Sequence, residues 1–304
     1  MSDIREIRSR MKSVSDTEKI TKAMYMISSS KMRKAKSELD RTKPHFDAVR
    51  NEIKRLFRSN QKIDSRYMFP EGGVEELPGA YAYIVITSDK GLAGYYNHAV
   101  IKEFEEQISD GHPYKLFMVG EYGRRYCAAH SLPYDEQFAY SAENPTLRRS
   151  REMAAVILKG YDMGEISKIF LIYTDMKNSV SQTTQVVRLL PFHRGDFVTD
   201  TVEREVQHEF EYFPSAEKVL QNMVFSYLAS YLYNALVDSY CSEQSARMNA
   251  MDEADKNAEE LLNSLNLEYN HARQGKITQE ITEISAGAKA LKKKKERSMV
   301  NNER

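Results

Sequence analysis

The first 56 residues of this chain carry a heptad repeat that few compact folds can use. Steps of three and four from Ile4 give 16 positions, and twelve of them are apolar. Such spacing over about eight heptads predicts one face of a coiled coil. A helix of this length would extend roughly 80 Å, more than an ordinary domain needs. The positions are Ile4, Ile7, Met11, Val14, Glu18, Thr21, Tyr25, Ser28, Met32, Ala35, Leu39, Thr42, Phe46, Val49, Ile53 and Leu56.

Two features modify this predicted helix. A second stripe, formed by Ile20, Ala23, Met24 and Ile27, lies beside the first seam, so we expect the middle of the helix to face more than one partner. Pro44 lacks a backbone N–H and should bend the helix or cost it a hydrogen bond.

The pattern of apolar residues changes after a linker at 60–79 that is rich in glycine and proline. Short apolar runs then alternate with helical patterns, which predicts a βαβ domain with a mostly parallel sheet. The expected helices are Asn97–Ser109, Glu121–His130 and Pro145–Asp162, the last with Asn144 or Thr146 near its start. The expected strands are Ala80–Ser88, Tyr114–Gly120, Lys168–Thr174 and Gln182–Leu190.

Helical patterning returns in the last third of the chain. Pro214–Ser215 with Glu217 resembles a helix start, and no proline follows up to Leu291. Two apolar repeats flank a polar interruption at Asn266–Lys276. We expect the two end helices to pair antiparallel and to bring the chain termini together. The repeats are Met251, Ala254, Ala258, Leu261 and Leu265, then Ile277, Ile281, Ile284, Ala288 and Leu291.

The expected fold class is therefore α/β plus a long antiparallel α-helical coiled coil, formed by the N- and C-terminal helices around a central Rossmann-like α/β domain. A basic tail should close the chain and fray. The segments are an N-terminal coiled-coil helix at 1–59, a linker at 60–79, the α/β domain at 80–202, a C-terminal coiled-coil helix at 203–291 and the tail at 292–304.

Charge and cysteine content narrow the class of protein. The whole chain has no net charge, but residues 1–60 hold 16 basic and 8 acidic residues, a net charge of +8. This predicts an acidic protein surface or nucleic acid as partner, or simply a solvated basic face. Cys127 and Cys241 show no disulfide or zinc spacing and fit a reducing cytosol. The longest apolar stretch, Ala80–Thr87, is too short to span a bilayer, so any membrane association should come through a partner.

The turn Thr87–Gly94 joins a predicted strand to a predicted helix, where α/β folds often bind phosphate. It matches neither GxGxxG nor GxxxxGK[ST], and Lys90 precedes the glycines. A structural turn with a surface contact is the favoured interpretation, and a nucleotide site is the alternative. The basic run Lys19–Lys36 lacks interleaved aromatic residues, which favours a protein groove over nucleic acid.

No catalytic pattern stands out elsewhere. The seven histidines are scattered, and neither HExxH nor GxSxG occurs. Acidic pairs such as Glu105/Glu106 should lie on solvated helix surfaces. The sequence therefore predicts no catalytic residue, no metal site and no cofactor, although an α/β phosphate-handling enzyme with helical arms is kept as a second hypothesis.

Several segments resemble one known family in order along almost the whole chain. The N-terminal segments are Ile4–Val14, Thr17–Met24 and Ser30–Ala35, and the central ones are Ser88–Asn97 and Met176–Pro191. The most specific are the C-terminal segments Ser242–Met251, Asn257–Ala258, Tyr269–Gln274 and Ile277–Ala288. Together they resemble the γ subunits of bacterial-type ATP synthases.

This resemblance implies a non-catalytic rotor shaft inside a head of three α and three β subunits, with the ε subunit and the membrane c-ring at its foot. It implies no nucleic-acid partner, a regulatory influence on ATPase activity and ion flow, and a peripheral position on the cytoplasmic side of the cell membrane. The implied contacts fall into four groups. They are catch-loop contacts at Arg273, Gln274, Thr278 and Glu280; lever contacts at Lys22, Met24 and Lys31; a tip bearing at Ile277, Ile281, Ile284, Ala288 and Leu291, with Ile4–Val14 beside it; and foot contacts with the ring and ε at Lys90, Glu209 and Tyr212.

The sequence departs from the family pattern at three places. Ala93 and Tyr95 stand where the family usually carries Cys and Gly, Ser285 and Lys289 interrupt the apolar tip, and a lysine-rich tail continues past the usual end. A helical scaffold or a divergent γ-like paralogue is therefore a third hypothesis. The coupling ion and the ring size do not follow from the sequence.

Overall fold

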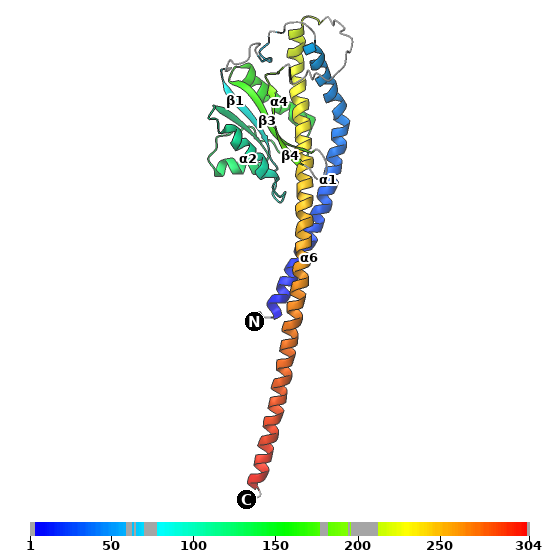
Figure 1. Ribbon diagram of the computed structural model, residues 1–304, viewed down its shortest axis with the longest axis vertical. Helices are drawn as coiled ribbons and strands as arrows, with labels where there is room; N and C mark the ends of the chain where they lie inside the picture. The colour runs from blue at the N-terminus through cyan, green and yellow to red at the C-terminus, as the bar shows by residue number, and fades with distance from the viewer. Residues whose placement is uncertain are drawn as a thin grey trace. The chain divides into compact units, whose positions relative to one another are not determined.

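The computed structural model describes residues 4–58, 63, 65–69, 78–176, 182–193, 195 and 212–302 of the chain. It divides into two compact units. We call Met26–Ala250 the domain unit, and Met1–Tyr25 with Met251–Arg304 the terminal unit. Helices α1 (Ile4–Arg58) and α6 (Ala216–Asn302) each contribute a part to both units (Figure 1).

The domain unit contains a four-stranded sheet in the spatial order β2-β1-β3-β4. Strand β1 pairs in parallel with β2 and β3, while β4 runs antiparallel to β3. The predicted Rossmann-like domain with a mostly parallel sheet is confirmed, and each strand and helix predicted within this domain begins and ends within two residues of its expected position. The strands are β1 (Ala80–Ile86), β2 (Tyr114–Val119), β3 (Ile166–Met176) and β4 (Gln182–Leu190); the helices are α2 (Tyr96–Ile108), α3 (Glu121–Ala129) and α4 (Leu147–Asp162).

The sheet is buried on both faces because successive side chains of a strand point to opposite sides. Ala82, Ile84 and Ile86 of β1 join the core formed with α4 and with parts of α1 and α6. Tyr83 and Val85 join a second core beneath α2 and α3. The strand is therefore apolar along its whole length, as its continuous run of apolar residues predicted.

Gly120 shapes the edge of the sheet where the functional loops emerge. It lies between β2 and α3 with φ of 90°, and a Cβ atom there would come 2.3 Å from the Thr87 carbonyl oxygen. Only glycine lets these two strand ends approach so closely.

The predicted seam of α1 is the buried face of the helix. Fifteen of its 16 positions are buried or half-buried; the exception is Tyr25, which is 40% exposed, while its neighbour Met24 is half-buried. Ile20 and Ile27 of the second stripe are exposed. The helix continues through Pro44. On α6, the buried residues Met251, Ala258 and Leu265 recur every seven positions, as a coiled coil requires.

Helices α1 and α6 run antiparallel within each unit. In the terminal unit, Arg8 of α1 contacts Tyr269, and Lys22 contacts Asp255. In the domain unit, the Phe46 ring packs against the rings of Tyr227 and Tyr231, and the Cys241 thiol lies against the Met32 carbonyl oxygen. Partner numbers on α6 fall as those on α1 rise, which confirms the predicted pairing.

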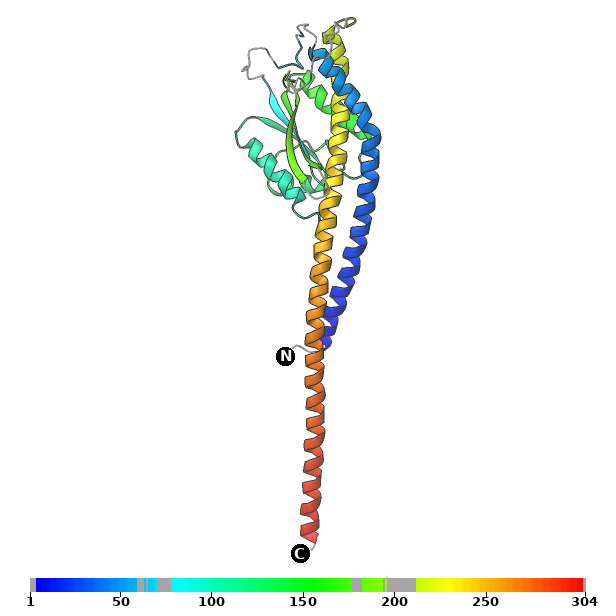
Figure 2. The same ribbon diagram turned by 45° about the vertical axis from the view of Figure 1, so that its right-hand side comes forward.

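The prediction that this pairing brings the chain termini together is wrong. Arg8 already lies against Tyr269, and α6 continues from there to Asn302, roughly 50 Å further along its axis. Figures 1 and 2 show the N-terminal end of α1 part-way along α6. Ile4–Val14 therefore packs on α6 before Ile277 rather than beside Ile277–Leu291. The seam of α1 is shorter than its partner, which the apolar repeats do not reveal.

Two further boundaries differ from expectation. Helix α6 begins at Ala216, just after the predicted Pro214–Ser215 start, and residues 201–211 lie outside the described part. At its other end the helix includes 292–302, where we expected fraying, because lysine and glutamate are good helix formers. Among the described residues, no helix is long and apolar enough to cross a membrane.

Candidate functional site

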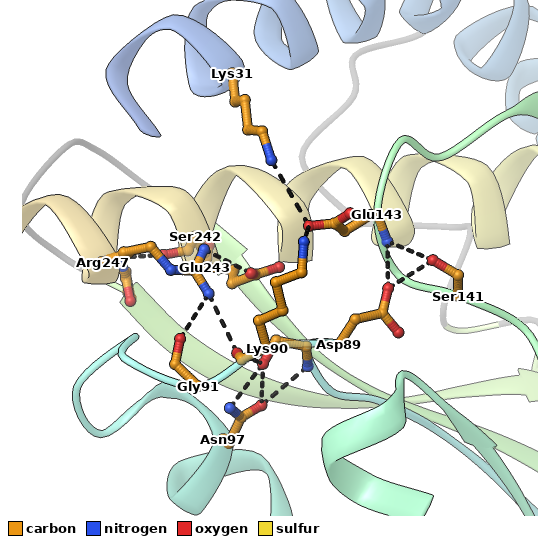
Figure 3. Close-up of polar contacts among 12 residues, drawn as sticks. Lys31, Asp89, Lys90, Gly91, Asn97, Ser141, Glu143, Ser242, Glu243 and Arg247 are labelled. Carbon is orange, nitrogen blue, oxygen red and sulfur yellow. Dashed lines mark hydrogen bonds and ion pairs between the residues drawn. The ribbon is translucent and has the colours of Figure 1, made fainter. Parts of the chain in front are cut away.

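The loop that follows β1 is fixed by a small network of buried polar groups. The Ser88 backbone N–H donates to the Asn97 Oδ1 atom at 2.9 Å, and the Asn97 amide donates to the Ser88 hydroxyl oxygen at 2.7 Å. The Ser88 hydroxyl in turn donates to the Lys90 carbonyl oxygen at 2.7 Å. Asn97 lies in the first turn of α2, so this network locks the loop to the helix after it (Figure 3).

Asp89 ties the loop to the start of α3 and to the segment before α4. Its carboxylate accepts the backbone N–H of Glu121 at the start of α3 at 3.0 Å, the Ser141 hydroxyl at 2.5 Å and the Glu143 N–H at 3.0 Å. Burial alone would raise the pKa of Asp89, but these hydrogen bonds hold it below its ordinary value. The Asp89 carboxylate thus occupies the N-terminus of α3, whereas the nucleotide-site alternative concerns the start of α2, the helix that follows the turn.

A buried ion pair on α6 holds the same loop from the other side. The Arg247 guanidinium lies 2.7 Å from the Glu243 carboxylate and donates to the carbonyl oxygens of Lys90 at 3.2 Å and Gly91 at 3.0 Å. Both side chains are less than a tenth exposed. Burial raises the pKa of Glu243, and the charge of Arg247 opposes that rise. Arg247 therefore couples α6 to the backbone of the loop.

Lys90 and Lys31 converge on one carboxylate. The Lys90 ammonium lies 3.0 Å from Glu143 Oε1, and the Lys31 ammonium of α1 lies 3.6 Å from the same oxygen. Figure 3 shows the two lysines pointing to Glu143 from opposite sides. The loop is therefore tied to α1 as well as to α6, and all of these residues belong to the domain unit.

The outer part of this loop points away from the domain. Leu92 adopts φ of 62° and is 65% exposed, and Tyr95 is 66% exposed and stacks on His98. Ala93, between them, is buried. Two residues of this loop depart from the family pattern. Ala93 lies in the interior of the domain, whereas Tyr95 lies on its surface.

The predicted lever residues are engaged within the chain. Lys22 lies 2.5 Å from Glu18 and 3.8 Å from Asp255, and the hydrogen bond to Glu18 raises the pKa of the lysine. Met24 is half-buried beside the seam. Lys31 belongs to the domain unit and pairs with Glu143, as described above. The Lys22 side chain remains about half exposed, which leaves it accessible from outside the chain.

The predicted catch-loop and tip residues share one exposed stretch of helix. Every residue from Arg273 to Leu291 is exposed, including Arg273, Gln274, Thr278 and Glu280. Among the side chains that the structure describes, none from elsewhere in the chain covers this stretch. Large apolar groups in water usually mark an interaction surface. The exposed fractions are 43% for Ile277, 61% for Ile281, 73% for Ile284 and 70% for Leu291, and Ala288 is also exposed.

Two of the predicted foot residues, Lys90 and Tyr212, lie far apart. Tyr212 is half-buried just before α6, where burial and the neighbouring Glu52 raise its pKa. Lys90 contacts the Arg247 region, which lies 31 residues beyond the start of α6, or roughly 45 Å along the helix. Glu209 lies outside the described residues.

Comparison with known proteins agrees over nearly the whole chain. A family model described as ATP synthase matches residues 3–291. A curated ATP synthase gamma chain of Ruminiclostridium cellulolyticum is 38% identical over 294 residues, covering 95% of this chain and 99% of that protein. One of Caldanaerobacter subterraneus is 39% identical over 292 residues, covering 93% and 98%. A chain of the Euglena gracilis mitochondrial ATP synthase shares the fold with a TM-score of 0.65, at 17% identity, covering 95% of this chain and 94% of that one.

A Rossmann-like domain carried by two antiparallel end helices, of which one continues past its partner, defines the central-stalk class of fold. The identities of 38% and 39%, which extend over 95% and 93% of this chain, are high enough to show the family. The chain belongs to the ATP synthase gamma chain family.

Sequence reasoning gave no role to the residues that fix the central loop. Glu243 and Arg247 were noticed only as part of a family segment, although a spacing of four on one helix is compatible with an ion pair. That the pair is buried, and that Arg247 reaches back to Lys90, depends on contacts between residues more than 150 positions apart. Nothing in the sequence distinguished Asp89 from an ordinary turn residue.

Proposed function

We propose that this chain works as the central rotor shaft of an ATP synthase, coupling ion flow through a membrane ring to ATP synthesis or hydrolysis in the catalytic head. The observation that carries this proposal is the end of α6, Arg273–Leu291, which is helical, exposed on every side and striped with large apolar residues. A stretch of this kind gains little free energy by itself and needs a surrounding partner.

The chain itself is proposed to be non-catalytic. Its partners would be the α and β subunits of the head, which hydrolyse ATP, the ε subunit and the c-ring, with nucleic acid playing no part. The hydrogen bonds that hold Asp89 in place support a structural use of this loop of the α/β domain. The protein would then be peripheral, held by the ring on the cytoplasmic side of the cell membrane.

The four groups of contacts are proposed at the positions given by the sequence. Arg273, Gln274, Thr278 and Glu280 would meet catch loops of the β subunits, and Ile277, Ile281, Ile284, Ala288 and Leu291 would turn in an apolar sleeve. Lys22, Met24 and Lys31 would meet acidic levers. Lys90, Glu209 and Tyr212 would serve the foot. Of these, Lys90 is the least favoured there, because it and Tyr212 occupy separate places on the domain unit.

Co-expression with the neighbouring subunits tests this function. We expect a large complex that hydrolyses ATP, with no hydrolysis by the chain alone. Ile281→Asp should lower the ATPase activity of the complex by placing a charge in the sleeve. Val156→Asp is the matched control, because Val156 is also exposed but lies on α4. ATP hydrolysis by the isolated chain, or equal activity of the two variants, would contradict the proposal.

A further inference from the structure

Leu92, in the loop after β1, combines two features that are each unusual for a leucine. Its backbone lies in the left-handed region, with φ of 62°, where the Cβ atom of an ordinary residue crowds the following carbonyl oxygen. Its side chain is 65% exposed, so it gains little free energy from burial within the chain. The chain therefore carries a strained residue whose side chain adds little to its own core.

The strained conformation of Leu92 is held in place by the polar network beneath the loop. Arg247 of α6 donates to the carbonyl oxygens of Lys90 at 3.2 Å and Gly91 at 3.0 Å, which fixes the two residues before Leu92 (Figure 3). The Ser88 hydroxyl donates to the Lys90 carbonyl oxygen as well. Asparagine and glycine tolerate such a backbone far better than leucine, so the backbone alone does not explain a leucine here. Strain of this kind is typical of functional positions.

The tip of the loop stands clear of the chain. Among the residues that the structure describes, no atom lies within 4 Å of a Cβ atom placed on Gly91 or Gly94. Tyr95 ends the loop; it is 66% exposed, and its ring stacks on His98 with the centroids 6.1 Å apart. Leu92 and Tyr95, which we call the loop knob, are thus two exposed apolar side chains carried on a fixed turn.

The surface beside the loop knob presents ammonium groups to the solvent. The Lys90 side chain is 70% exposed and that of Lys31 is 39% exposed, whereas Glu143, which pairs with both, is only 25% exposed. Glu243, the partner of Arg247, is almost entirely buried. The carboxylates are the buried members of these pairs, so the accessible charge is positive. Such a surface attracts the carboxylates of a partner.

We propose that the loop knob docks into an apolar pocket, rimmed by carboxylates, on a neighbouring subunit of the assembly. A fixed apolar anchor that fills a pocket is typical of interface hot spots, because little conformational entropy is lost on binding. A lipid surface is less well matched, since lipid binding uses longer amphipathic faces than two side chains. The inference rests on the proposed rotor assembly and adds to it a contact surface distinct from the end of α6.

Leu92→Asn separates docking from a structural role of the turn. Asparagine tolerates the left-handed backbone, so the folding equilibrium constant of the isolated full chain should rise about fivefold. Urea unfolding measures this constant. Met163→Asn is the matched control, because Met163 is 63% exposed but has an ordinary φ of −74°. The control should leave the constant unchanged within about twofold.

The opposite effect is expected on assembly. Addition of the purified chain to the other subunits of the head should give ATP hydrolysis, and the chain concentration at half-maximal activity measures binding. Leu92→Asn should raise this concentration roughly tenfold, because the pocket loses its anchor, and Met163→Asn should leave it unchanged. Lys90→Gln should raise it about threefold, because the attraction to the acidic rim is lost.

A more stable chain that assembles more weakly supports the docking knob. An unchanged half-maximal concentration for Leu92→Asn would overturn it. A loss of stability in the isolated Leu92→Asn chain would also overturn it, because Leu92 would then be packed within the chain.

The remaining outcomes concern the partner. Tighter assembly of Lys90→Gln would contradict the acidic rim. Binding of the isolated chain to vesicles of anionic lipid, lost in Leu92→Asn, would replace the subunit by a membrane. If the wild-type chain gave no ATP hydrolysis with the other subunits, the rotor assignment itself would be refuted, and this inference with it.

Discussion

Two stretches of the same helix, α6, meet opposite surroundings. Between Tyr227 and Arg247 all but four residues are buried, and the four exceptions are half-buried. Between Arg273 and Leu291 every residue is exposed. The first stretch is buried on nearly all sides because the sheet and α1 pack around it. The second keeps a single apolar stripe, which a globular chain would be expected to cover.

The difference shows that one helix can be both the core of a domain and a surface for other molecules. The buried stretch obtains its stability from packing within the chain. The exposed stretch depends on local hydrogen bonds and on exposed pairs such as Lys276–Glu280, which contribute little. Substitutions in the first should therefore act on the folding of the chain, and substitutions in the second should act on assembly.

The largest contrast is expected from placing the same charge in each stretch. Leu236→Asp puts a carboxylate where Leu236 is 1% exposed, and it should cost more than about 4 kcal/mol in the free energy of unfolding. Ile284→Asp should change that free energy by less than about 0.5 kcal/mol, because Ile284 is 73% exposed. Urea unfolding of the isolated chain measures both. Similar losses would mean that the exposed stretch has a partner within the chain.

The next largest effect compares two arginines. Arg247→Gln leaves the buried Glu243 without its cation and should cost about 3 kcal/mol. Arg273→Gln, on the exposed stretch, should leave the stability of the chain unchanged. The double variant Glu243→Gln with Arg247→Gln should recover part of the loss, because no buried charge remains. Additive losses in the double variant would show that the two side chains act independently.

The sequence predicted the pairing of α1 with α6 only in part. The heptads of α1 predicted its buried face reliably because the same apolar spacing repeats many times along the helix. One local exception, where Met24 is half-buried in place of Tyr25, does not change which face is buried. The apolar stripe at Ile277–Leu291 looks like another seam, and periodicity cannot tell whether the partner belongs to the same chain. For that reason the pairing was predicted correctly and the position of the termini was not.

The polar contacts that Asp89 and Arg247 make with the central loop could not be predicted from the sequence for a different reason. Asp89 is held by groups from α3 and from the segment before α4, and Arg247 reaches a loop that lies far away in the chain. Such contacts leave no periodic pattern in the sequence from which they could be predicted. The interpretation of the turn Thr87–Gly94 as structural stays a prediction, which the hydrogen bonds of Asp89 to Ser141 and to the Glu121 N–H support.

A smaller and acid-dependent effect is expected at Asp89. Because hydrogen bonds hold its pKa below the ordinary value, its contribution to stability is present above about pH 4 and is lost as the pH falls through the folded-state pKa. Asp89→Asn should therefore destabilise the chain at neutral pH by about 1 to 2 kcal/mol, and less in acid. Urea unfolding at neutral and acidic pH measures this. A loss that is equal at both, or one shared by the exposed Asp110→Asn, would refute the assigned role.

The smallest effect on the chain itself is expected at Lys22. Its pairs with Glu18 and Asp255 are exposed, so Lys22→Glu should hardly change unfolding. In the assembled complex it should lower ATP turnover at low salt, with partial recovery as salt screens the repulsion from an acidic partner. Lys102→Glu, at an exposed lysine on α2, is the control. Equal turnover at low salt would remove Lys22 from the contact surface.

Hydrogen exchange of α6, in the free chain and in the assembled complex, tests the central claim most directly. We predict that amides in Tyr227–Arg247 are protected in both states, because the chain itself buries them. Amides in Arg273–Leu291 should exchange rapidly in the free chain and become protected only in the complex. Protection of Arg273–Leu291 in the free chain, or its absence in an active complex, would contradict the account.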